Sequence, residues 1–274
     1  MNSVASAGQQ AKGAAGKATR SRAFDRLARF GMACRGLVYA LIGLLAMRIA
    51  LGGGGEEADK TGAVRTIAEQ PFGTVVLWLL AIGFTALALW QLSEALMGGV
   101  LDVKERVEAG AHVVVYALFV FTLVSLLSGG GAGSSTDEKS KDLSATVMDW
   151  PGGQFIVGLV GLAIIGIGLY WIHEGVKKKF RRHLRTGEMN PKTRNIVEKL
   201  GMTGYVARGV VAIGVGVFTV SAAISFDPDE AKGIDATLRS FADTPFGPWL
   251  LVLVALGLLT FAAYCFCEAR WRKT

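Results

Sequence analysis

Six long apolar runs constrain the fold of this chain more than any other feature. They cover residues 31–51, 72–97, 112–128, 155–173, 205–224 and 246–267. Each is roughly 17 to 26 residues long, and a helix of about 20 residues crosses the hydrocarbon core of a bilayer. A membrane-spanning barrel would instead show alternating segments of about ten residues, which this sequence lacks. The sequence therefore predicts an all-α membrane protein with six transmembrane helices.

The charges of the connecting segments predict the orientation of the protein. Lysine and arginine are frequent before the first run, in segments 98–111 and 174–203, and after Cys267, whereas the other three connections are acidic. Positive charge accumulates in cytoplasmic segments, so we expect a multi-pass protein with both termini in the cytoplasm. These segments account for the net charge of +7, which therefore gives no evidence for nucleic-acid binding.

One basic segment, KKKFRRHLR, begins four residues after the fourth run. Its Phe180 and Leu184 are four residues apart and would share one face of a helix. We expect the segment to rest on anionic headgroups, at roughly 1 kcal/mol per basic residue. The alternative is an ordinary positive-inside anchor without lipid specificity. The expected lipid contacts are Lys177, Lys178, Lys179, Arg181, Arg182 and Arg185.

Short motifs recur along the chain. Arg35-Gly36-Leu37-Val38 resembles Arg208-Gly209-Val210-Val211, and Pro71-Phe72-Gly73 recurs as Pro245-Phe246-Gly247. A weaker match in the middle of the chain places His112 opposite Arg35. Each repeat has an entering helix, an outer loop and a returning helix, and the loop carries a short amphipathic stretch expected to lie on the outer surface. Parallel repeats predict approximate threefold pseudosymmetry about the membrane normal, and a row of hairpins is the alternative.

The repeats resemble the bacterial domain of unknown function numbered 1206. The resemblance rests on the Arg-Gly-Leu-Val-Tyr-Ala-Leu-Ile-Gly stretch from Arg35, the Gln-Pro-Phe-Gly turn from Gln70 and the helix end Glu94-Ala95. It implies three tandem two-helix units in a bacterial plasma (inner) membrane, and it supplies no activity. The second repeat departs from the pattern, with His112 in place of the arginine. The expected parts are a disordered basic cytoplasmic tail (1–25), repeat one (26–98), repeat two (105–178), a basic cytoplasmic loop (179–198) and repeat three (199–274).

The apolar runs also carry charges that recur with the repeats. The entering helices carry Arg35, His112 and Arg208, and the returning helices end at Glu94, Glu174 and Glu268. A lone charge at the centre of a membrane costs about 2.5–3.5 kcal/mol on insertion scales, and pairing lowers that cost. We predict three pairs of opposite charge, within a repeat or between neighbouring repeats. Such pairs would fasten the hairpins, and the alternative is that they gate or line a path along the pseudosymmetry axis.

Two further features bear on packing and function. His112 could make its pair sensitive to pH, and ordinary hydrogen bonding is the alternative. Small residues along the runs, among them Gly158, Gly161, Gly166 and Gly168, are expected to let helix backbones approach closely.

The sequence lacks the motifs of common catalytic and cofactor sites. It has no phosphate-binding glycine loop, no His-Glu-x-x-His, no Cys-x-x-Cys and no nucleophile elbow. We therefore expect no enzyme, no cofactor and no metal site. The favoured interpretation is a non-enzymatic scaffold, accessory subunit or lipid-binding protein with membrane protein partners and no nucleic acid. The alternative is a small channel or transporter for an ion or solute.

Overall fold

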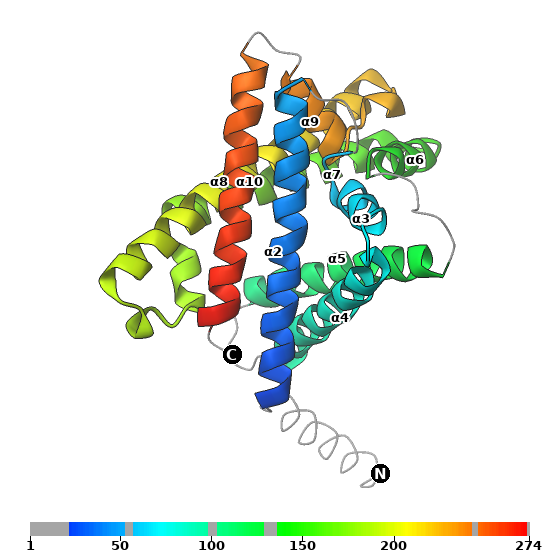
Figure 1. The fold of residues 1–274 in the computed structure, drawn as a ribbon. Helices are drawn as coiled ribbons and strands as arrows, with labels where there is room; N and C mark the ends of the chain where they lie inside the picture. Colours follow the sequence, from blue (N-terminus) through cyan, green and yellow to red (C-terminus); the bar gives the residue numbers. More distant parts are fainter. Residues whose placement is uncertain (1–21, 53–56, 98–102, 129–135, 243–245, 273–274) are drawn as a thin grey trace, which may run out of the picture.

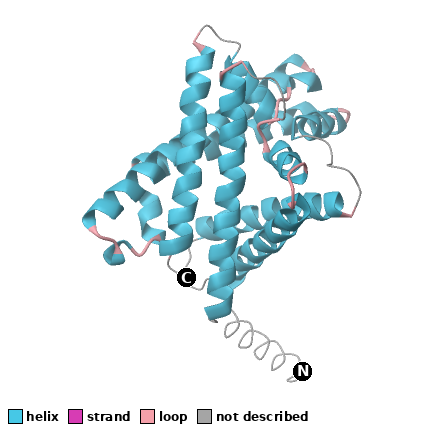
Figure 2. Ribbon diagram, viewed as in Figure 1, coloured by secondary structure: helices cyan, strands magenta, loops and turns pink. Residues whose placement is uncertain are grey.

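The computed structural model describes residues 22–52, 57–97, 103–128, 136–242 and 246–272 and is helical over these residues, with no strand (Figures 1 and 2). The expected tail 1–25 lies almost entirely outside the described residues, which begin in a helix at Arg22. The helices, with the short 3₁₀ segments marked η, are α2 (Arg22–Ala50), α3 (Lys60–Ala68), α4 (Gly73–Met97), α5 (Val103–Leu127), α6 (Thr136–Met148), α7 (Gly153–Val176), η1 (Lys179–His183), η2 (Thr186–Glu188), α8 (Pro191–Ser225), η3 (Pro228–Glu230), α9 (Ile234–Ala242) and α10 (Gly247–Trp271).

Five helices are long and apolar enough to cross a membrane. Their candidate spans are Asp25–Ala50, Gly73–Ser93, Gly153–Val176, Pro191–Ser225 and Gly247–Trp271. The sixth expected crossing lies in α5, whose apolar part, His112–Leu127, is shorter than the other five. Over the described residues, the all-helical fold with several long apolar helices supports the prediction of a membrane-embedded protein.

Helix α8 is much longer than its expected span of 205–224. Asn190 caps its start by accepting a hydrogen bond from the Thr193 N–H at 2.7 Å, and Pro191 occupies the first turn. Its 35 residues extend over about 52 Å, which exceeds the roughly 30 Å of hydrocarbon. One crossing therefore does not need the whole of α8, and its first turns pack against the segment that precedes them.

Neighbouring repeats pack through one recurring contact. The most extensive helix contacts join α4 to α5, α7 to α8 and α10 to α2, so that each returning helix lies against the entering helix of another repeat. The third contact brings the last helix of the chain back to the first, and Figure 1 shows α10 and α2 side by side. The three helix pairs run in different directions in this view. Over the described residues, α5 and α7 of the second repeat form no comparable contact.

Glycine pairs bring α7 and α8 into backbone contact. A Cβ atom on Gly161 would lie 3.0 Å from the Gly216 carbonyl oxygen, and one on Gly168 would lie 2.8 Å from that of Gly209. The two helices therefore touch at two levels separated by two helical turns. The prediction of glycine-mediated packing is confirmed at Gly161 and Gly168, whereas a Cβ atom on Gly166 would meet nothing within 4 Å.

Among the short outer helices described, α3 and α9 are more buried than expected, whereas α6 is largely exposed, with Leu143 at 66%. The stretch 63–67 does lie in a helix, α3, but Thr61, Gly62, Ala63, Val64 and Ile67 are buried and the helix packs against α2 and α4. In α9, Leu238 is 0% exposed. These helices have enough apolar side chains to gain more from burial within the protein than from lying on its surface.

The basic segment 177–185 also turns inward. Phe180 and Leu184 are 0% and 1% exposed, and the Phe180 ring stacks on Tyr205 with 5.5 Å between centroids. The backbone N–H of Arg185 donates to the carbonyl oxygen of Trp271 at 2.8 Å, which ties the segment to the end of α10. The expectation that Phe180 and Leu184 form a lipid-facing helix face is therefore wrong. Both side chains instead fill a small core beneath α8 and α10.

Candidate functional site

The candidate site lies among charged side chains at and near the end of the molecule where α2 begins and α10 ends, here called the basic end. Arg35 on α2 forms an ion pair with Glu268 on α10, and the second carboxylate oxygen of Glu268 pairs with Arg272. All three side chains are largely buried, at 13%, 3% and 11% exposure respectively. One of the predicted pairs of opposite charge is thus present, and it joins the first repeat to the third.

Arg35 also contacts the second repeat. Its Nη1 donates to the hydroxyl oxygen of Tyr116 on α5 at 3.2 Å. An equivalent contact involves the other repeat arginine, because the Arg208 guanidinium lies 5.7 Å from the ring centroid of Tyr39. Tyr39 and Tyr116 occupy matching positions in the repeated Val-Tyr-Ala-Leu motif. Each arginine therefore meets the tyrosine of an entering helix from a different repeat.

Arg208 does not form the expected ion pair. Its guanidinium lies over the Trp171 ring at 3.7 Å from the centroid and 5.2 Å from the centroid of Phe261. Among the described residues, no carboxylate lies within ion-pairing distance of Arg208. Glu268, its partner within the same repeat, pairs with Arg35 and Arg272, and Glu174 of the neighbouring repeat lies 3.8 Å from Arg182. A carboxylate partner for Arg208 is thus not found among the described residues, which leave out the side chain of Glu94.

The remaining predicted pair involves His112. Its ring lies 5.8 Å from the Tyr116 ring, which places it beside the Arg35 cluster. The side chain of Glu94 lies outside the described residues. Pairing of His112 with either Glu94 or Glu174 therefore stays a prediction.

Lys60 is a further cation in the interior that the sequence analysis did not single out. It begins α3, and its ammonium group lies 5.6 Å from the ring centroid of Phe119 on α5. Burial, with the nearby positive charge of Arg208, lowers the pKa of Lys60 from 10.5 to about 8, while Asp59 opposes the shift. No pattern in the sequence marks this position, because Lys60 is one of several charges within a polar outer loop.

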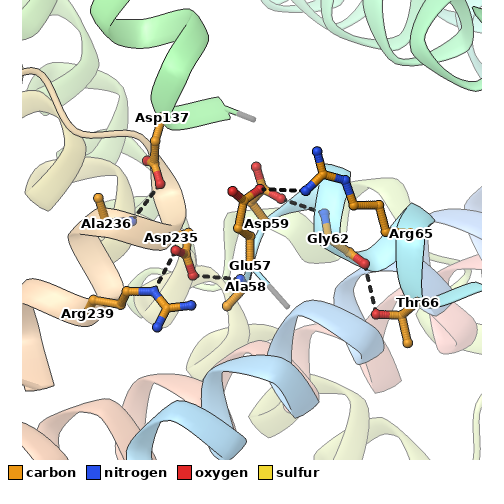
Figure 3. Close-up of polar contacts among 10 residues, drawn as sticks. All are labelled: Glu57, Ala58, Asp59, Gly62, Arg65, Thr66, Asp137, Asp235, Ala236 and Arg239. Atoms are coloured by element: carbon orange, nitrogen blue, oxygen red, sulfur yellow. Dashed lines mark hydrogen bonds and ion pairs between the residues drawn. The ribbon is translucent and has the colours of Figure 1, made fainter. Parts of the chain in front are cut away.

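The opposite end of the molecule, here called the acidic end, joins the three outer segments through carboxylates (Figure 3). Asp235 of the third repeat accepts a hydrogen bond from the Ala58 N–H of the first at 2.7 Å, and Asp137 of the second accepts one from the Ala236 N–H at 3.0 Å. Asp59 caps α3 through the Gly62 N–H at 2.8 Å. The acidic loops thus hold one another together.

This arrangement also has electrostatic consequences. Burial raises the pKa of Asp137, although its hydrogen bond from Ala236 opposes the shift, and the charge of Asp235 adds to it. Placing acidic side chains beside helix starts is favourable, since helix N-termini carry partial positive charge. The first turns of the short helices, with Asp59 before α3 and Asp137 and Asp235 inside α6 and α9, are the sequence signal for this cluster.

The basic residues predicted to contact lipid are largely engaged within the protein. The carboxylate of Glu198 on α8 forms ion pairs with Lys178 at 3.0 Å and with Arg181 at 3.2 Å. Arg185 lies 3.6 Å from Glu188, and Arg182 lies near Glu174 as described above. Lys177, Lys179 and Arg182 remain exposed at the surface. This leaves a smaller basic surface than the sequence suggested.

Over the described residues, no group of three or more His, Cys, Asp and Glu side chains is arranged to hold a metal ion. The charged side chains instead face one another or aromatic rings inside a helical protein with several long apolar helices. The fold therefore indicates a membrane-embedded helical protein whose mainly apolar core contains a few charged side chains.

Comparison with known proteins gives the particular family. The model of the Domain of Unknown Function (DUF1206) matches the chain three times, over residues 30–98, 108–178 and 203–272. The chain belongs to this family, and the prediction of three repeats is confirmed. It is similar to "Uncharacterized protein YxxB" of Bacillus subtilis (strain 168), at 28% identity over 245 residues covering 87% of this chain and 88% of the relative. No solved structure matches.

Proposed function

We propose that this protein is a non-enzymatic scaffold or accessory subunit of the bacterial plasma membrane, with six crossings and both termini in the cytoplasm. The observation that carries the proposal is the use of buried charge to join different repeats. The Arg35–Glu268 pair links the first and third repeats, and the carboxylates of Asp235 and Asp137 link all three at the acidic end. Such pairing within the chain suits a rigid membrane body better than a reaction site.

Threefold pseudosymmetry is part of this proposal. Its support is the recurring contact of α4 with α5, α7 with α8 and α10 with α2, together with the matching contacts Arg35–Tyr116 and Arg208–Tyr39. In this arrangement α5 supplies the sixth crossing. Its apolar part is 16 residues, about 24 Å of helix, so it crosses only with help from the flanking residues or a locally thinner bilayer.

The topology is tested by labelling single cysteines from either side of the membrane in intact cells. A cysteine at Lys141 is expected to react with an impermeant reagent from outside, and one at Lys177 only after the cells are opened. The native cysteines are replaced in this background, and the two sites serve as controls for each other. Labelling of both from the same side would refute the six-crossing topology.

The function is tested by purifying the tagged protein in native lipid and identifying what accompanies it. We expect another membrane protein to co-purify in a constant ratio to this chain and to bind it through the exposed loops. The exposed basic residues Lys177, Lys179 and Arg182 would add contact with anionic lipid, so their replacement by glutamine should reduce association with anionic vesicles. Lys141→Gln on the acidic side is the matched control. Purified protein that remains without a partner and moves solutes into liposomes would contradict the scaffold role.

A channel or transporter is the second candidate, because two interior cations, Arg208 and Lys60, have no carboxylate within ion-pairing distance among the described residues. Ionisable residues inside membranes often mark the routes of ions or substrates. Flux of an anion into liposomes that is lost in Arg208→Gln, but kept in Lys141→Gln, would favour this role over a scaffold.

A further inference from the structure

Three cations converge on the interior faces of α2 and α5. Arg35 contacts Tyr116, and Lys60 lies over Phe119, which is three residues farther along the same face of α5. On α2, Tyr39 lies one turn beyond Arg35, and Arg208 lies against its ring. Lys60 therefore contacts α5 one helical turn beyond the contact of Arg35, and Arg208 contacts α2 one turn beyond Arg35 itself.

Negative charge near these cations is scarce. Glu268 pairs with Arg35 and is shared with Arg272, so it has no capacity to neutralise two further cations. Among the described residues, neither Arg208 nor Lys60 has a carboxylate within ion-pairing distance. Cation–π contacts of the kind that Arg208 makes contribute about 0.5–2 kcal/mol each, which only partly offsets the loss of hydration. Among the described residues, the charge of Asp59 therefore offsets part of the charge of Lys60, whereas Arg208 forms no ion pair with a carboxylate.

The placement of Arg208 favours an oxyanion as the missing partner. Its guanidinium lies 3.7 Å from the centre of the Trp171 ring, so the flat face is covered by the indole. A guanidinium stacked in this way keeps its N–H donors in the plane, directed away from the ring. Over the described residues these donors have no hydrogen-bond acceptor in the protein. A planar pair of donors matches two oxygens of a phosphate group.

The aromatic neighbours of Lys60 and Arg208 lie on two helices of the second repeat, α5 and α7. Over the described residues α5 and α7 do not pack together as the other consecutive long helices do. Phe119 on α5 contacts Lys60, and Trp171 on α7 contacts Arg208, so these two helices carry the aromatic neighbours of both cations. A headgroup arriving between α5 and α7 would meet Lys60 and Arg208.

We propose that Arg208 and Lys60 form an interior site for a phosphate-type anion, either free inorganic phosphate or the headgroup of an anionic phospholipid. Arg208 provides the paired donors and Lys60 provides a second positive charge. Arg35, neutralised by Glu268, closes the site toward the basic end. The site is independent of the scaffold role, since a rigid accessory subunit and a transporter could each contain it.

The test uses the full chain in nanodiscs of phosphatidylcholine, with two arms. One arm titrates inorganic phosphate at constant ionic strength by calorimetry, and the other measures retention of phosphatidylglycerol by native mass spectrometry. We expect binding in at least one arm, weakened at least tenfold by Arg208→Gln and by Lys60→Met. Arg208→Lys keeps the charge but loses the planar donors, and it should bind less tightly than the wild type.

Lys141→Met, which removes an exposed cation at the acidic end, is the matched control and should bind like the wild type. Lys60→Met removes a charge that is costly to bury, so this variant is expected to fold. Binding of phosphatidylglycerol alone would identify the headgroup as the ligand, and binding of inorganic phosphate would identify a free anion. Absence of binding in both arms, or wild-type binding by both Lys60→Met and Arg208→Gln, would overturn the proposal.

Discussion

Neutralising Glu268 should be the most damaging single change in the interior charge cluster. Glu268→Gln leaves Arg35 and Arg272 beside each other without an anion, and their side chains are only 13% and 11% exposed. Removing one partner of a buried ion pair costs about 3–5 kcal/mol, because the remaining charge is uncompensated. Here two cations remain, so we expect a loss of roughly 4–5 kcal/mol in the free energy of unfolding.

The reciprocal change should cost less. In Arg35→Gln the Glu268 carboxylate keeps its second partner, Arg272, so no anion is left alone. We expect a loss of about 1–2 kcal/mol, which is the value of a charged hydrogen bond. The double variant Arg35→Gln with Glu268→Gln leaves one cation rather than two and should be less damaged than the sum of the single changes, by about 2 kcal/mol.

The assay is unfolding of the purified protein in mild detergent, followed by circular dichroism and by retention of a monodisperse elution profile. Glu188→Gln is the control, because Glu188 is 63% exposed and lies 3.6 Å from Arg185. An exposed pair of this kind contributes under about 1 kcal/mol. Equal damage from Arg35→Gln and Glu268→Gln, with additive effects in the double variant, would refute the shared carboxylate.

Three further predictions concern other parts of the structure. The lowered pKa of Lys60 predicts that the free energy of unfolding rises by roughly 3 kcal/mol between about pH 8 and pH 10.5, because the unfolded state binds more protons in this range. Lys60→Met should remove this rise and stabilise the protein at pH 7 in the same unfolding assay. Gly161→Ala should lower stability by about 1–3 kcal/mol because its Cβ would lie 2.9 Å from the Val220 nitrogen, whereas Gly166→Ala should not, and equal effects would contradict the glycine contact. Phe180→Ala should cost about 3–5 kcal/mol, and Phe155→Ala, which removes a side chain that is 75% exposed, far less by thermal unfolding.

The buried charges show which contacts can be predicted from a repeat pattern and which cannot. Matching motifs placed Arg35 and Glu268 at comparable depth, and these two residues do meet. The same reasoning finds no partner for Arg208 among the described residues, where the returning helix of the second repeat has Trp171 in place of Cys265. Trp171 offers an aromatic face to the guanidinium, and Arg182 lies beside Glu174. Sequence repeats specify equivalent backbone positions, but they do not specify which of several nearby partners a long side chain selects.

The inward turn of segment 177–185 is a second case. Its charges suggested contact with lipid, since four-residue spacing of Phe180 and Leu184 fits a helix on a membrane surface. The structure instead buries both side chains, because the projecting start of α8 and the end of α10 supply an apolar surface directly beside the segment. The spacing of apolar residues shows which side chains need burial, but it does not show whether lipid or another part of the protein buries them.

The amino-acid sequence alone predicts the apolar helices, their division into three repeats and the charges at the ends of those helices. These properties follow from hydrophobic length and from short motifs, which act over a few residues and are readable in one dimension. Three-dimensional packing sets the remaining features: returning helices lie against a different repeat, α3 is buried, and Lys60 lies near Arg208. Those outcomes depend on contacts between residues far apart in the chain, where shape and the competition among neighbouring charges select one partner over another.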